Sequence, residues 1–66
     1  MNTVNVVLNL NHSYTLTFKD QAITCINENS LQWHLHNTCG CNTDEVIVIL
    51  GTVNMVGECT TEVGAA

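Results

Sequence analysis

The sequence predicts a small all-β domain, on three observations. Apolar and polar residues alternate in several short stretches, turn-forming residues separate these stretches, and no segment shows the three- and four-residue apolar spacing of an amphipathic helix. We therefore expect an antiparallel meander of five to six strands, closed as a barrel or stacked as a two-layer sandwich, with no substantial helix. The 66 residues should form one domain, with 60–66 as an irregular tail.

The first half of the chain shows the alternation most clearly. Strands are predicted at residues 3–10, 14–18, 22–26 and 31–36, separated by turn formers at 11–13, 19–20 and 27–30. The first two should pair as a hairpin whose solvent-facing side carries Asn and Thr in place of charged residues. In the fourth strand, Trp33 is expected to pack into the core beside Leu31 and Leu35, with the histidines on the opposite side.

The second half contains the most apolar segment. Residues 46–50 are consecutive aliphatic side chains, which is typical of a strand buried on both faces, here spanning 45–50. Gly51 is expected to mark a bulge or bend, and 52–59 to form a sixth strand. Because the predicted edges lack proline and lysine, an open edge would pair with another chain. We therefore expect a homo-oligomer, which would also supplement the thin core of so short a chain.

Charged residues are few and mostly acidic. Lys19 is the single Lys or Arg, against six Asp or Glu, and the net charge is −5. Nucleic-acid binding and attachment to an anionic membrane are not expected, because both depend on clustered Lys and Arg. No secretory signal is expected at the start of the chain, and the longest apolar run is shorter than the roughly 20 residues of a membrane span. The expected location is the cytoplasm or a virus particle.

The densest cluster of reactive side chains lies within residues 33–41. If residues 37–38 form a two-residue hairpin turn, the His-x-His and Cys-x-Cys pairs on either side of it face each other. Two imidazoles and two thiolates on one side of a hairpin suit tetrahedral Zn²⁺, and a structural zinc site would stabilise a small domain. The predicted metal ligands are His34, His36, Cys39 and Cys41. The alternatives are exposed histidines beside loop cysteines, and disulfide bonding.

Disulfide bonding has several possible pairings, among Cys25, Cys39, Cys41 and Cys59. Cys25 shares a predicted strand face with Ile23, which suits a buried thiol, whereas Cys59 follows the last strand and could reach a second subunit. Catalysis is not expected. A thiol nucleophile needs an oriented base and an oxyanion site in a cleft, and few residues remain to build one after the core is filled.

Two functions from different classes agree with these observations. The first is a non-enzymatic structural or assembly subunit, as of a phage particle, filament or ring, that self-associates through β edges and apolar faces and is cross-linked by cysteine or clipped by zinc. The second is a small acidic inhibitor or adaptor in which Asp44, Glu45, Glu58 and the loop at 37–44 contact a basic surface of a larger protein. A zinc-binding β-hairpin module is a third interpretation.

Overall fold

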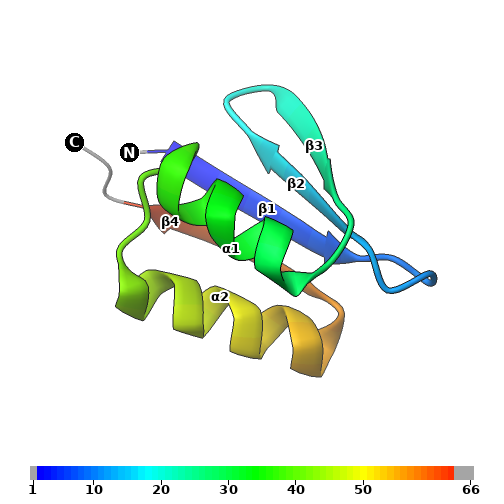
Figure 1. Cartoon of the computed structure of the whole chain (residues 1–66). Helices are drawn as coiled ribbons and strands as arrows, with labels where there is room; N and C mark the ends of the chain where they lie inside the picture. Colours follow the sequence, from blue (N-terminus) through cyan, green and yellow to red (C-terminus); the bar gives the residue numbers. More distant parts are fainter. Residues whose placement is uncertain (1, 64–66) are drawn as a thin grey trace.

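The computed structural model describes residues 2–63 and overturns the all-β prediction, because two helices cover one face of a single four-stranded antiparallel sheet (Figure 1). In chain order the elements are β1 (Asn2–Leu8), β2 (Tyr14–Phe18), β3 (Gln21–Cys25), α1 (Glu28–Asn37), α2 (Thr43–Val56) and β4 (Glu58–Val63). The strand order is β3-β2-β1-β4, so β3 and β4 are the two edges. The result is a two-layer α+β fold, and neither a barrel nor a sandwich forms.

The three N-terminal strands form where the alternation predicts them. β1 pairs with β2 so that Val6 lies opposite Leu16, and β2 pairs with β3 so that Leu16 lies opposite Ile23. The β2–β3 turn consists of Lys19 and Asp20, with φ of 50° and 65°, and two positive φ values in a two-residue turn match the twist of a type I′ hairpin. Alternate residues therefore face the helices, and the others face away from them.

α1 replaces the predicted strand at 31–36. The turn formers before it start the helix, because the Asn27 side chain caps the first turn by accepting a hydrogen bond from the Ser30 backbone N–H (2.8 Å). Leu31 and Leu35 are four positions apart and fully buried on one side of the helix. The same two leucines also fit the alternation of a strand, which is why the prediction was wrong.

Trp33 lies on the outer side of α1. The helix turns by about 200° over two residues, so Trp33 points away from the core that Leu31 and Leu35 enter. Its side chain is 59% exposed and meets the His34 ring edge-on, with the ring centroids 5.1 Å apart. The prediction that Trp33 packs in the core is therefore wrong.

α2 replaces the predicted strand at 45–50. Asn42 and Glu45 form a capping box: the Asn42 side chain accepts a hydrogen bond from the Glu45 N–H (2.8 Å), and the Glu45 carboxylate accepts one from the Asn42 N–H (3.0 Å). The helix ends at Gly57, whose φ of 96° is unstrained only for glycine. Gly51, predicted as a bulge, lies inside the helix. Capping at both ends and tertiary packing therefore outweigh the β propensity of the aliphatic run.

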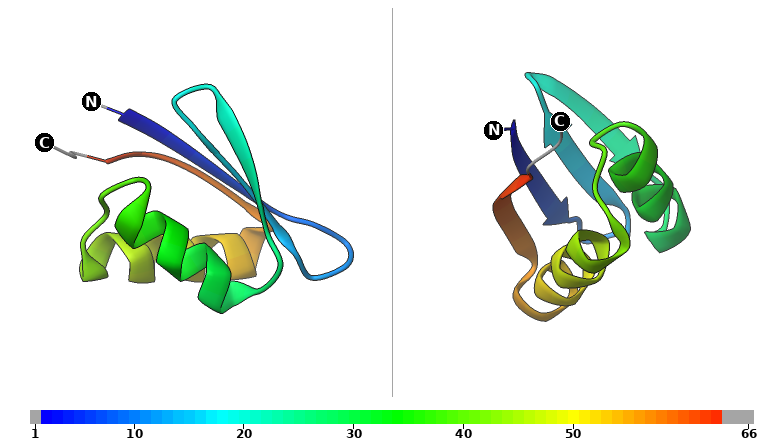
Figure 2. Two further views of the ribbon diagram at one scale, coloured as in Figure 1. Left: turned by 45° about the horizontal axis from the view of Figure 1, so that its top comes forward. Right: turned by 90° about the vertical axis from the view of Figure 1, so that its left-hand side faces the viewer.

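Figure 2 shows the two helices as a layer over one face of the sheet, and buried side chains from both layers form a single core. α1 packs on β2 and β3, and α2 packs on β1 and β4. α2 enters the core with Val46, Ile49, Leu50 and Val53, which have the three- and four-residue spacing of an amphipathic helix, so the expectation that no segment shows this spacing is wrong. The predicted sixth strand at 52–59 is divided between the end of α2 and the start of β4. The predicted tail at 60–66 begins inside β4, and residues 64–66 lie outside the described residues. None of the helices described is long and apolar enough to cross a membrane.

Candidate interaction surface

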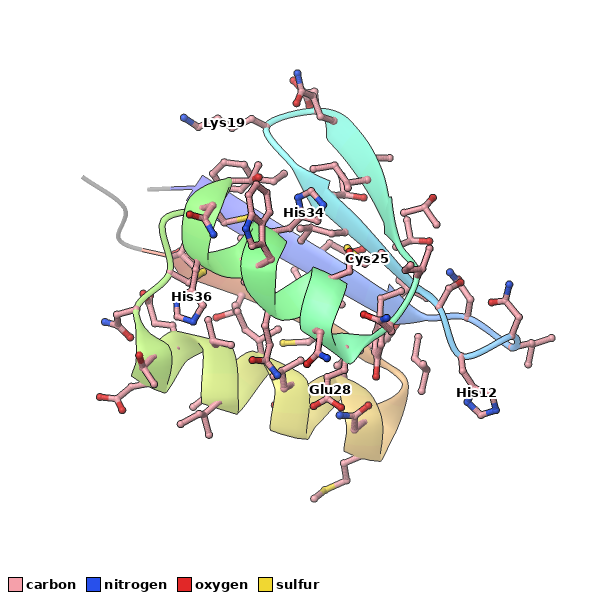
Figure 3. The ribbon with its side chains drawn as sticks, in the orientation of Figure 1. His12, Lys19, Cys25, Glu28, His34 and His36 are labelled. Atoms are coloured by element: carbon pink, nitrogen blue, oxygen red, sulfur yellow. The ribbon has the colours of Figure 1, made fainter. Side chains whose placement is uncertain are left out.

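The predicted zinc ligands do not converge on one point. His34 and His36 lie on α1, and Figure 3 shows them on different sides of the helix, with His36 directed toward α2. His34 Nδ1 is 3.3 Å from Thr38 Oγ1, and His36 Nδ1 is 3.1 Å from the Cys41 carbonyl oxygen. The hairpin that the zinc prediction required is a helix and a loop. Between residues 2 and 63, no group of three or more His, Cys, Asp or Glu side chains could hold a metal ion.

The four cysteines are free, buried thiols on the inner side of the fold. Burial raises the pKa of the Cys39 thiol from 9.0 to about 11, and the neighbouring Cys41 and Cys25 add to the rise. Burial also raises the pKa of Cys25, Cys41 and Cys59. A protonated, buried thiol is a poor nucleophile and a poor metal ligand, so the cysteines behave as small core residues. Cys59 lies inside β4 and does not reach outward.

A shallow pocket of about 220 Å³ lies between the first half of α2 and the end of β4. Its walls are Val48, Ile49, Thr61 and Val63, and its carboxylates are those of Asp44, Glu45 and Glu62. This volume is below the roughly 300–1,000 Å³ of typical small-molecule sites. No cysteine or histidine lines the pocket, so it does not bring a nucleophile and an imidazole base together.

The outer face of α2 is the most distinctive surface of the molecule. Four large apolar side chains are exposed there or at its end: Ile47 by 62%, Val48 by 64%, Met55 by 86% and Val56 by 68%. No charged residue occurs from Val46 to Gly57, so neither face of the helix beyond its first turn carries a charge. A solvent-exposed helix face is normally polar or charged. An exposed apolar patch of this kind typically marks an interaction site.

Gly51 lies in the middle of this outer face. Apart from the helix's own backbone, a Cβ atom added there would meet no atom of the described residues within 4 Å, so packing among these residues does not require glycine. Glycine inside a helix costs about 1 kcal/mol of stability relative to alanine. What it provides is a place where a neighbouring element can approach the helix backbone closely. We define the α2 outer face as Ile47, Val48, Gly51, Met55 and Val56.

The face of the sheet that the helices leave uncovered is polar: Asn and Thr occupy it on the first hairpin, as predicted, and Glu58 and Glu62 of β4 share it. Asn5 Nδ2 donates to Thr60 Oγ1 across β1 and β4 (2.7 Å), and Asn9 Nδ2 donates to Thr15 Oγ1 (3.0 Å). These hydrogen bonds pair the polar groups with each other. The uncovered sheet face therefore offers much less apolar surface than the α2 outer face.

The α2 outer face could not be recognised while residues 45–50 were interpreted as a strand buried on both sides. Two signals in the sequence identify the helix: the Asn42-x-x-Glu45 capping pattern and the glycine at position 57. Once a helix is assumed, the apolar residues divide into two faces, of which one has no partner among residues 2–63. Comparisons of the chain with protein-family models, with curated proteins and with solved structures gave no match.

Proposed function

We propose that this protein is a non-enzymatic subunit that self-associates, with the α2 outer face as its principal contact. The observation that carries the proposal is this apolar, charge-free helix face on a domain of only 66 residues. The chain exposes 4172 Å² of surface, so a standard-size interface of roughly 800 Å² per partner would cover about a fifth of the molecule. Burial of apolar surface stabilises by roughly 25 cal/mol per Å², which favours association here.

A second copy is the partner that the charge distribution favours. The chain carries a net charge of −5, so two copies repel unless they meet at an uncharged surface. The outer face of α2 is such a surface. In an antiparallel arrangement the acidic first turns, with Asp44 and Glu45, lie at opposite ends of the contact, whereas a parallel arrangement would bring them together. Antiparallel packing about Gly51 would set Ile47 of one copy near Met55 of the other, with Val48 beside this contact.

Replacing Val48 with glutamine is expected to weaken self-association about tenfold or more, because each dimer loses two apolar contacts of roughly 1 kcal/mol. Glutamine has a higher helix propensity than valine, so the variant should fold as well as the parent chain. Sedimentation velocity over a dilution series measures the effect. Leu10→Gln is the matched control, because Leu10 is fully exposed in the β1–β2 turn, outside α2. Equal weakening by both variants would contradict the proposal.

Gly51→Gln separates folding from association. The side chain enters open space, so the monomer should gain roughly 0.5–1 kcal/mol of unfolding free energy from helix propensity. The same side chain blocks close approach of a second helix, so self-association should weaken. Urea denaturation at low protein concentration and sedimentation at high concentration measure the two quantities. A variant that is both more stable and equally associated would show that Gly51 does not lie at the contact.

The acidic inhibitor or adaptor is the alternative, and one observation favours it. Three carboxylates, those of Asp44, Glu45 and Glu62, surround the apolar pocket between α2 and β4, which would suit a basic side chain of a partner. The sedimentation series distinguishes the two functions. A chain that remains monomeric at every concentration would favour the adaptor, and a mass that rises with concentration would favour the self-associating subunit.

A further inference from the structure

β3 is an edge strand with a free row of backbone groups. Among the strands of residues 2–63 it pairs with β2 alone, through a two-residue turn at Lys19 and Asp20. Such a turn makes Phe18 and Gln21 a hydrogen-bonded pair, and pairs alternate along an antiparallel ladder. The N–H and C=O groups of Ala22 and Thr24 therefore point away from β2. Of the described backbone hydrogen bonds outside helices and strand ladders, none involves β3.

Within the part of the chain that the structure describes, this edge has none of the usual protections against pairing with another strand. Lysine, proline, a bulge or a covering segment normally blocks an exposed edge. Residues 21–25 are Gln-Ala-Ile-Thr-Cys, without a charge or a proline, and they pair with β2 without interruption of the register. Ala22 and Thr24 are exposed. β4, at the other edge, carries Glu58 and Glu62, which oppose pairing with a second copy of itself.

We propose that the free edge of β3 pairs with β3 of a second copy, in an antiparallel arrangement centred on Ile23. Ala22 of one copy then forms two backbone hydrogen bonds with Thr24 of the other. Because a two-fold axis relates the copies, Thr24 of the first copy forms the same two hydrogen bonds with Ala22 of the second. No carboxylate lies within the paired segments, which matters for a chain with a net charge of −5. The two four-stranded sheets become one continuous eight-stranded sheet with both helix layers on the same side.

This contact is separate from the α2 outer face and does not depend on it. α1 lies over β2 and β3, and α2 lies over β1 and β4, so the two surfaces are on different parts of the molecule (Figures 1 and 2). The α2 contact rests on the proposed function. If it forms together with the β3 contact, each subunit takes part in two interfaces, each with its own two-fold axis. Such a subunit builds a closed assembly if the two axes intersect at a suitable angle, which is a tetramer for a right angle, and an extended polymer if the axes do not intersect.

Hydrogen exchange of single amides tests the β3 contact directly. When about nine tenths of the molecules are paired, exchange at the Ala22 and Thr24 amides should slow about tenfold relative to the dilute protein. The Ile23 amide, which points toward β2, is the internal control and should stay protected at every dilution. Rapid exchange at Ala22 and Thr24 in the fully associated protein would overturn the proposal. Protection that is independent of concentration would overturn it as well.

A pair of charge variants adds a second measurement. Thr24→Lys places an ammonium group on the β3 edge, and Thr60→Lys makes the same change on the β4 edge, so both lower the net negative charge equally. Only Thr24→Lys should abolish the concentration-dependent protection of the Ala22 amide. Loss in both variants, or in neither, would contradict pairing through β3. In Val48→Gln the protection should persist, so failure of the α2 contact and failure of the β3 contact are distinguishable.

Discussion

Replacing Leu16 with alanine is expected to remove most of the stability of the fold. Leu16 is fully buried in the inner strand β2, opposite Val6 of β1 and Ile23 of β3. A buried Leu→Ala change costs about 2–5 kcal/mol, because it removes apolar contacts and leaves a cavity. At 0.05–0.15 kcal/mol per residue, a domain of this size has only about 3–10 kcal/mol of stability in total. Urea denaturation followed by Trp33 fluorescence measures the loss.

Thr17→Ala is the matched control for Leu16→Ala. Thr17 is the next residue of the same strand, but its side chain faces away from the helices, opposite Asn5 and Ala22. We expect a change of at most about 1 kcal/mol, as for substitutions away from the core. Both variants must be compared at one protein concentration, since self-association would add to the apparent stability. Similar losses in the two variants would mean that the core does not lie on the face that Leu16 enters.

Raising the pH above 9 is expected to destabilise the protein through its buried thiols. The pKa of Cys39 is about 11 in the folded state, against an ordinary value of 9.0. A thiol with a raised pKa contributes stability that is fully present below pH 9 and is lost as the pH rises toward 11, because the unfolded chain ionises first. In this window the Cys39 thiol lowers the unfolding free energy by at most about 1.4 kcal/mol per pH unit. Since all four cysteines shift in the same direction, their effects add.

The measurement is urea denaturation in a reducing buffer at a series of pH values from neutral to strongly alkaline. Cys39→Ala should flatten the decline above pH 9, because it removes the thiol with the pKa of about 11. Alanine also leaves a small cavity, so the comparison is between the slopes of the two pH profiles and not between their heights. An unchanged slope would show that Cys39 is not among the groups that titrate on unfolding.

The strands of the N-terminal half were predictable because their signals lie within short stretches of the sequence. Period-two alternation and a two-residue turn define the β2–β3 hairpin, and β2 was predicted with the bounds it has in the structure. The prediction failed where two periods fit the same residues. Leu31 and Leu35 satisfy both a strand and a helix, and Asn27 was interpreted as a turn former although it caps α1. In such a case the cap residues, and not the apolar pattern, distinguish a helix from a strand.

The position of the candidate interaction surface could not be predicted from the sequence alone. The low charge and the apolar run indicated self-association, and that remains a proposal. The location depended on whether residues 45–50 form a strand or a helix, because a helix buries only Val46, Ile49 and Leu50 and leaves Ile47 and Val48 outside. The zinc prediction depended on the same choice for residues 34–36. Side chains two positions apart share one face of a strand but not of a helix.

The position of β1 between β2 and β4 has a consequence for how the chain folds. The hydrogen bond from Asn5 to Thr60 joins residues 55 positions apart, whereas β1 and β2 are joined by a short turn. A hairpin closes in roughly 1–10 μs, but long-range strand pairing must first overcome loop-closure entropy and is slower. During synthesis, the backbone groups of β1 that pair with β4 therefore stay without a strand partner until β4 emerges from the ribosome. The nascent chain is most exposed to misassembly and to chaperones in that interval.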